Sequence, residues 1–303
     1  MTRFTFIPLL IATILTLASC KNDDYIKAID NTKFELKVGD AVMLVDASDG
    51  AKVVSLKLGE KEILAQHVEP ANGRFGNRFD YGSTFWPSPQ EPWYWPPIKT
   101  YDYDNYLTEL TEKKLTATSG INERYPYRFI KEYSIDSRKQ AFVITYTIEN
   151  PNDSTISVAP WEITRVPNAG VFFFDAKKAD ISPNDLIPTK YDFNYAWCEF
   201  SSATEQRKIF VDPKGWLAYS NNGFLLLKQF DDLHQGEAAP GESEMEVYIA
   251  DGELFIELEN QGAYATLQPG EKLTYTVRWY VRPTESAPIA SKQLSDEVSK
   301  LFK

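Results

Sequence analysis

Polar and apolar residues alternate along most of the chain between Phe34 and Val281. The alternating stretches are rich in valine, isoleucine, threonine and aromatic residues, and such period-two patterning predicts half-buried β-strands. Turn signals separate them, for example Ser48-Asp49-Gly50 and Asn150-Pro151-Asn152-Asp153. The predicted strands are Phe34–Val38, Val42–Asp46, Val53–Leu58, Phe129–Ile135, Ala141–Glu149, Ser157–Val166, Ile209–Val211, Leu217–Ser220, Phe224–Gln229, Met245–Ala250, Leu254–Glu259 and Leu273–Val281.

Helical periodicity is convincing only near the end of the chain, where Leu294, Val298, Leu301 and Phe302 share one face. The pattern therefore predicts an all-β protein, a large twisted antiparallel β-sandwich with a short C-terminal helix. No change in composition and no internal repeat divides the chain. We expect one β-sandwich domain over residues 31–303.

The first residues predict export and lipidation. Arg3 gives a short positive start, and the apolar run from Phe6 to Leu17 is too short to span a bilayer. It ends in Leu-Ala-Ser-Cys at residues 17–20, which resembles the lipobox of bacterial lipoproteins. The resemblance implies a signal peptide over residues 1–19, lipidation of Cys20 and a tether over residues 20–30. We expect attachment to the outer membrane through this lipid alone, facing the periplasm or the cell surface.

Charge and cysteine content narrow the function further. The chain of 303 residues has a formal net charge of −11, and such a surface repels nucleic acid. With Cys20 lipidated, Cys198 has no disulfide partner and reads as a buried apolar filler. The sequence has no zinc ligand pattern, phosphate-binding loop or dinucleotide fingerprint, so we expect no metal and no cofactor. We expect a monomer.

Aromatic residues are concentrated between Phe75 and Tyr106, where eleven of thirty-two residues are aromatic and five are proline. Proline removes backbone donors, so the stretch from Pro87 to Pro97 is predicted to be neither a helix nor a central strand. A rigid loop would hold Trp86 and Trp95 at the surface, where flat rings suit the C–H-rich face of a sugar. The alternative is that these rings only close the end of the sandwich core.

Several segments together resemble the galactose mutarotase-like β-sandwich superfamily, and most closely uncharacterised bacterial lipoproteins related to aldose 1-epimerases. The segments that carry this resemblance are Val45–Leu56 with Lys61–Leu64, Tyr81–Pro87, Thr145–Asn150 with Ala159–Glu162, Leu258–Gln261, and Leu267–Glu271. The resemblance implies the superfamily's large β-sandwich and a sugar site on it.

The resemblance also assigns roles to residues. In aldose epimerases the glutamate of the Leu-Glu-x-Gln segment is the general base, which implies that role for Glu259. The glycine–tryptophan–proline segment and the strand pair imply substrate contacts for Trp86, Trp161 and Glu162, and the aromatic loop adds Trp95 as a substrate-binding residue. The segment at residues 74–79 resembles one in which an arginine holds a sugar hydroxyl, which implies that role for Arg78.

This sequence departs from the epimerase pattern at the general acid. Epimerases supply a histidine on the strand where this chain has Ala-Pro-Trp-Glu at residues 159–162, and its two histidines, His67 and His234, lie elsewhere. Glu162 would serve as an acid only if burial raised its pKa towards neutrality.

Three interpretations follow for the function. The first is a carbohydrate-binding lipoprotein that acts as an aldose 1-epimerase-like isomerase at a sugar's anomeric centre. The second is a glycan-binding lipoprotein that lost the acid histidine and catalyses nothing. The third is a structural lipoprotein whose aromatic residues belong to the core. Convergence of Trp86, Trp95, Arg78 and Glu259 on one open pocket would favour the first two.

Overall fold

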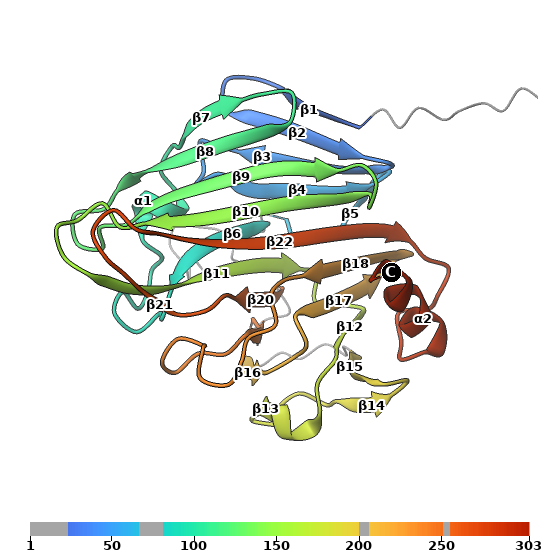
Figure 1. Ribbon diagram of the computed structural model, residues 1–303. Coiled ribbons are helices and arrows are strands. Elements are labelled where there is room, and N and C mark those ends of the chain that lie inside the picture. Colours follow the sequence, from blue (N-terminus) through green and yellow to red (C-terminus); the bar gives the residue numbers. More distant parts are fainter. Residues whose placement is uncertain (1–23, 67–80, 200–205, 251–254, 303) are drawn as a thin grey trace, which may run out of the picture.

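Two antiparallel sheets face each other and enclose the main hydrophobic core (Figure 1). The computed structural model describes residues 24–66, 81–199, 206–250 and 255–302. The first sheet has the order β1 (Tyr25–Ala28), β2 (Lys33–Val38), β3 (Ala41–Asp46), β4 (Lys52–Leu58), β6 (Ser83–Ser88), β11 (Ile156–Val166), β20 (Ile256–Gln261), β19 (Met245–Ile249), β16 (Arg207–Val211) and β13 (Ile181–Ser182), with β5 (Lys61–Glu62) beside β4 and β21 (Ala265–Leu267) beside β11.

The second sheet covers the first and carries the longest hairpins. Its order is β14 (Lys190–Asp192), β15 (Tyr195–Glu199), β12 (Val171–Phe174), β17 (Trp216–Asn221), β18 (Phe224–Gln229), β22 (Lys272–Pro283), β10 (Ala141–Glu149), β9 (Arg128–Asp136), β8 (Lys114–Ile121) and β7 (Leu107–Leu110). The described helices are α1 (Lys99–Asp102), a short 3₁₀ turn η1 (Lys178–Asp180) and α2 (Lys292–Leu301). The predicted antiparallel β-sandwich with a short C-terminal helix is confirmed.

Period-two patterning located most of the long strands. The predicted ranges Ala141–Glu149 and Phe224–Gln229 coincide with β10 and β18, and along β2 buried side chains alternate with more exposed ones. Where hydrophobic residues do not alternate, the prediction missed strands, as in β12, whose four residues are all buried. A strand covered on both faces needs no polar positions.

The expected aromatic loop is partly a strand, which corrects the prediction that Pro87 belongs to neither a helix nor a central strand. β6 includes Pro87 and pairs with β11 over six residues, whereas its other edge meets β4 only at Ser83. At Pro87 this second edge of β6 has no neighbouring strand in the described part of the chain, so no backbone N–H is needed there. Proline tolerates such a position because it has no N–H to donate. The segment from residue 89 to residue 98 is irregular, as predicted.

The folded part starts before residue 31. β1 pairs with β2 in register from Tyr25 to Ala28, so these residues form the edge of the first sheet within the range expected to be a tether. Within the described residues, no helix is long and apolar enough to cross a membrane.

The C-terminal helix α2 packs on the outer face of the second sheet. Leu294 and Val298 are buried there against Trp197, Trp216 and other residues of that sheet, as the helical periodicity predicted. The hydroxyl of Ser291 accepts a hydrogen bond from the backbone N–H of Leu294 and caps the first turn.

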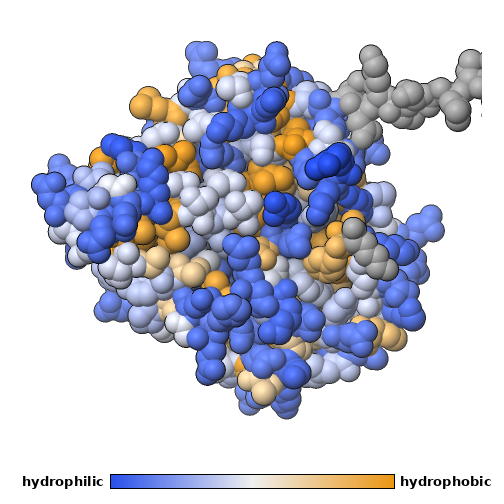
Figure 2. All heavy atoms as spheres, viewed as in Figure 1, coloured by the Kyte–Doolittle hydropathy of each residue, from blue (hydrophilic) through white to orange (hydrophobic). Residues whose placement is uncertain are grey.

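Hydrophilic residues cover much of the molecular face seen in Figure 2, with hydrophobic patches between them.

A buried ion pair joins the two sheets at their centre. The Nζ of Lys228 on β18 lies 2.8 Å from Oε2 of Glu162 on β11, and both side chains have no exposed surface. The hydroxyl of Tyr146 on β10 donates to the other carboxylate oxygen at 2.7 Å, and Lys228 also donates to Thr164 at 2.7 Å. Burial lowers the pKa of Lys228, while Glu162 counteracts this effect. Each charge is thus matched by a partner from the opposite sheet.

Removing one member of this pair should destabilise the fold strongly. We expect Lys228→Met to lower the free energy of unfolding by about 3–5 kcal/mol, because Glu162 would remain as a buried charge without its cation. Lys114→Met is the matched control: Lys114 on β8 of the same sheet pairs with Glu132, but it is exposed, so its loss should cost about 0–1 kcal/mol. Urea denaturation measures both values. Similar small losses in the two variants would contradict this account.

Candidate functional site

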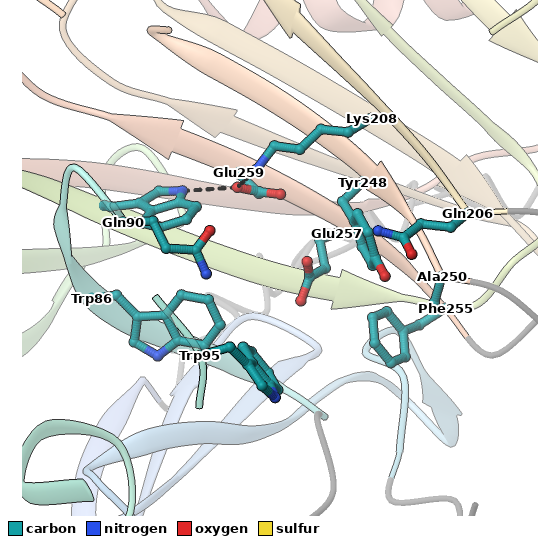
Figure 3. A pocket seen from close by; sticks show the side chains of 11 residues that line it. Trp86, Gln90, Trp95, Gln206, Lys208, Tyr248, Ala250, Phe255, Glu257 and Glu259 are labelled. Atoms are coloured by element: carbon teal, nitrogen blue, oxygen red, sulfur yellow. Dashed lines mark hydrogen bonds and ion pairs between the residues drawn. The ribbon is translucent and has the colours of Figure 1, made fainter. Parts of the chain in front are cut away.

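A pocket of about 340 Å³ opens on the face of the first sheet that points away from the second sheet. That volume is at the lower end of the range for small-molecule sites. β6, β11, β16, β19 and β20 and the segments that follow β6 and β19 provide its walls (Figure 3). The lining residues are Trp86, Gln90, Trp95, Trp161, Gln206, Lys208, Tyr248, Ala250, Phe255, Glu257 and Glu259.

Strand alternation explains why these side chains converge. On β11, Glu162 and Thr164 contact Lys228 of the second sheet, so Trp161 and Arg165 must point to the opposite face. In β20, Glu257 pairs with Arg165 and Glu259 with Ile163, which places both glutamates on the face of Trp161. In β19, Tyr248 pairs with Glu257, which brings it to the same face.

The tryptophans of the expected aromatic loop divide between core and surface. Trp86 and Trp93 are 4% and 9% exposed, and each packs against Trp161, Trp86 edge-to-face at 5.4 Å between ring centroids. Trp95 is 45% exposed and forms the outer wall of the pocket beside Trp86 (Figure 3). Trp93 therefore belongs to the core and Trp95 to the surface, whereas Trp86 is both buried and part of the pocket lining.

A second buried carboxylate fixes the orientation of Trp86. Asp102 in α1 accepts hydrogen bonds from Nε1 of Trp86 at 2.9 Å and from the hydroxyl of Thr84, and it lies 3.5 Å from Nζ of Lys52. Burial alone would raise the pKa of Asp102, but Lys52 and these hydrogen bonds outweigh it and hold the pKa below its usual range. Trp86 is therefore a rigid part of the pocket floor.

Glu259 lies at the inner end of the pocket and is only 1% exposed. Its Oε2 accepts a hydrogen bond from Nε1 of Trp161 at 2.9 Å and lies 3.5 Å from Nζ of Lys208. Its Oε1 has no hydrogen-bond partner among the described residues. Buried carboxylate oxygens are rarely left without a donor, so this oxygen retains the capacity to accept a hydrogen bond.

Lys208 on β16 also contacts a second glutamate, Glu246. Its Nζ lies 2.5 Å from Oε2 of Glu246 on β19 and 5.2 Å from the ring centre of Trp161. Burial would lower the pKa of Lys208, but Glu259 and Glu246 reverse that effect and the pKa is raised. Burial raises the pKa of Glu259, and Lys208 and Trp161 oppose this only in part. Glu259 is thus suited to take up or release a proton.

A fourth group of charges lies nearer the opening. Glu257 on β20 forms an ion pair of 2.8 Å with Arg165 on β11. The guanidinium of Arg165 also lies over the rings of Trp86 and Phe255, at 5.4 and 5.7 Å from their centres. The pair fastens β11 to β20 beside the pocket and supports its aromatic walls.

The sequence predictions of site residues have different outcomes. The structure brings Trp86, Trp95, Trp161 and Glu259 together at the pocket, whereas Glu162 points into the sandwich interior and does not line it. This corrects the expected position of Glu162, because one step along β11 reverses the face. Arg78 and Cys20 lie outside the described residues.

Among the described residues, no histidine lies at the pocket to act as the general acid. His234 is exposed and is not among the pocket residues, and His67 lies outside the described residues. Cys198 is buried, and burial raises the pKa of its thiol to about 12, in keeping with an apolar filler. The described residues contain no cluster of three or more metal-ligating side chains.

Several pocket residues were not predicted from the sequence. Lys208 and Tyr248 lie opposite each other in register across β16 and β19, so both side chains point to one face. Nothing in the sequence, however, distinguishes that face from the one in the core. Gln90 and Phe255 come from segments next to strands, where alternation gives no guide.

The arrangement combines flat aromatic walls with a buried acid–base group. Rings from Trp86, Trp95 and Trp161 present apolar faces, while Gln90 and Gln206 present amide donors and acceptors. Such a site can hold a ligand that has both an apolar face and hydroxyl groups. Glu259 can accept a proton from such a hydroxyl.

Comparison with known proteins gives matches in structure only. No protein-family model and no curated protein sequence matches the chain. A candidate aldose 1-epimerase from Escherichia coli K12 superposes with a TM-score of 0.57 at 13% identity, covering 83% of this chain and 99% of that one. A galactose mutarotase-like protein from Clostridium acetobutylicum gives 0.52 at 13% identity, covering 87% and 100%.

A third match is a TPR-domain containing protein from Parabacteroides distasonis, with a TM-score of 0.57 at 14% identity. The match covers 84% of this chain and 48% of that one. Identities this low establish the architecture alone. The chain has the galactose mutarotase-like fold.

Proposed function

We propose that the pocket binds a carbohydrate. The observation that carries this proposal is the position of Glu259, a buried carboxylate that lines a pocket with tryptophan walls and has one oxygen without a hydrogen-bond partner among the described residues. A sugar presents C–H groups to a ring face and hydroxyls at its edge, which matches this combination of walls and acceptor. The galactose mutarotase-like fold supports the proposal as an analogy of architecture.

Trp95 provides the sharpest test of binding, because it lines the pocket and is 45% exposed. A glycan array with the protein lacking residues 1–20 would identify a ligand, and calorimetry would then give its affinity. We expect Trp95→Ala to weaken that affinity by about tenfold, since losing one stacked ring costs about 1.4 kcal/mol.

Tyr94→Ala is the matched control for Trp95→Ala. Tyr94 is the neighbouring aromatic residue in the same segment, is 75% exposed and does not line the pocket. Its truncation should leave the affinity unchanged. Equal effects of the two substitutions, or no glycan bound at all, would reject carbohydrate binding at this pocket.

Catalysis is a second candidate function, and the raised pKa of Glu259 favours it. In an aldose 1-epimerase-like reaction, Glu259 would take the proton from the anomeric hydroxyl while the ammonium of Lys208 gives one to the ring oxygen. The bond from C1 to the ring oxygen would break, C1 would become a carbonyl, and the ring would open. Rotation about the C1–C2 bond and closure would return both protons and give the other anomer. Lys208 beside Glu259 is a cation that can donate a hydrogen bond to the ring oxygen.

Glu259→Gln separates catalysis from binding. The amide keeps the size and one acceptor but cannot take a proton, so an epimerase-like enzyme should lose turnover by at least about a hundredfold. Polarimetry of fresh single-anomer sugar measures the rate, and calorimetry measures binding. If the rate of anomer exchange with the unaltered protein does not exceed the rate in buffer, the non-catalytic binding function stands instead.

We further propose that the protein is attached to the outer membrane through a lipid on Cys20. The support is the apolar run that ends in Leu-Ala-Ser-Cys at residues 17–20. Cys20→Ala should move the protein from the membrane fraction to the soluble fraction, as seen by cell fractionation and immunoblotting. Cys198→Ala should leave it in the membrane fraction. A Cys20→Ala protein that stays membrane-bound would exclude lipid attachment at this residue.

A further inference from the structure

Two glutamates on neighbouring strands share a single cation beneath the pocket. Glu246 and Glu259 face each other in register across β19 and β20, and they are 0% and 1% exposed. Lys208 reaches both from β16, at 2.5 Å from Glu246 and 3.5 Å from Glu259. Two ionised carboxylates would leave one buried negative charge without a counterion, which is energetically costly.

The surrounding charges include one further cation, which lowers the pKa of Glu259 less than Lys208 does. Arg165 of β11 is the other described cation near the pocket, and Glu257 of β20 forms an ion pair with it at 2.8 Å. Glu242, in the segment before β19, accepts a hydrogen bond from the backbone of Gln90 and adds a further negative charge. Tyr248 is the remaining titratable group on the described pocket wall. This excess of negative charge favours a state in which Glu246 and Glu259 together retain one proton.

Hydrogen bonds determine where that proton can be on Glu246. Gln261 accepts from the hydroxyl of Ser88 at 2.6 Å through its amide oxygen, and its amide nitrogen therefore donates to Oε1 of Glu246 at 2.8 Å. The backbone N–H of Ser243 donates to the same oxygen at 3.2 Å. A proton on Glu246 is consequently confined to Oε2, the oxygen that faces Lys208.

On Glu259, the oxygen that can carry the proton is not the one that contacts Lys208. Its Oε2 already accepts from Trp161 and contacts Lys208, so a proton on Glu259 would occupy Oε1, the oxygen without a partner. A proton on Glu246 leaves Glu259 as a proton acceptor at the pocket. A proton on Glu259 makes it a donor to the same space.

We propose that Glu246 is a positioning residue for Glu259: the two carboxyl groups share Lys208 and hold one proton between them at neutral pH. Glu246 does not line the pocket and acts only through Glu259 and Lys208. One group can then serve as acceptor and as donor at the inner end of the pocket without a histidine. How this shared proton would act on a sugar rests on the proposed carbohydrate-binding function. The proton sharing itself does not depend on that function.

The indole of Trp161 reports the charge of Glu259 directly, because its N–H donates to that carboxylate. In the full chain labelled with ¹⁵N-tryptophan, the Trp161 indole signal, assigned by its absence in Trp161→Phe, should shift with pH as Glu259 ionises. Glu246→Gln should lower the midpoint by about one pH unit, a tenfold change in proton affinity, because the competing carboxyl is gone. Lys208→Met should raise the midpoint, because both carboxylates lose their cation.

Glu35→Gln is the control for loss of one negative charge. Glu35 lies on β2 of the same sheet, where it interacts with Tyr25 and Lys27, and its substitution should leave the midpoint unchanged. The remaining tryptophan indole signals show whether each variant is folded, and Lys208→Met tests the proposal if Glu246→Gln fails to fold. A midpoint that stays in place in folded Glu246→Gln or Lys208→Met would overturn the proposal. No carbohydrate is used, so this result is independent of sugar binding.

Discussion

The alternation of side chains along β11 is the constraint on which the pocket depends. Glu162 points inward and meets Lys228 at 2.8 Å, while Trp161, its neighbour, points outward and donates to Glu259. A shift of one residue would bury Trp161 against the second sheet and expose Glu162. Because Lys228 has no exposed surface and requires that carboxylate, the buried pair holds β11 in one register and so keeps Trp161 at the pocket.

The first sheet therefore carries buried charge on both of its faces. On the inner face Glu162 has one cation to itself, and Tyr146 completes its hydrogen bonding. On the outer face Glu246 and Glu259 divide one lysine between them. The inner arrangement is balanced and suits a structural role. The outer one has an excess of negative charge next to open space, and perturbed carboxyl groups of this kind occur at functional sites more often than in cores.

The sequence predicted the strands better than the site, for a physical reason. Period two reveals which positions share a face, as it does for Glu257 and Glu259, which both line the pocket. It does not tell which face is the core. Glu162 was expected at the pocket from the resemblance to the epimerase strand pair, but alternation places it on the face opposite Trp161, inside the sandwich. Lys208 was missed because an isolated lysine on a short strand has no sequence signal, and its importance comes only from Glu246 and Glu259 on the strands beside it.

Fold and chemistry diverge at this site. The galactose mutarotase-like architecture supplies the concave arrangement of strands, but chemistry is determined by the side chains placed upon it. In this chain the strand expected to bring an acid histidine brings Trp161, whose indole cannot transfer a proton usefully but can hold a carboxylate by its N–H. Under the proposed catalytic function, the acid–base role therefore falls on Glu259 and Lys208. Burial raises the pKa of Glu259, and the cation that it shares with Glu246 opposes this effect only in part.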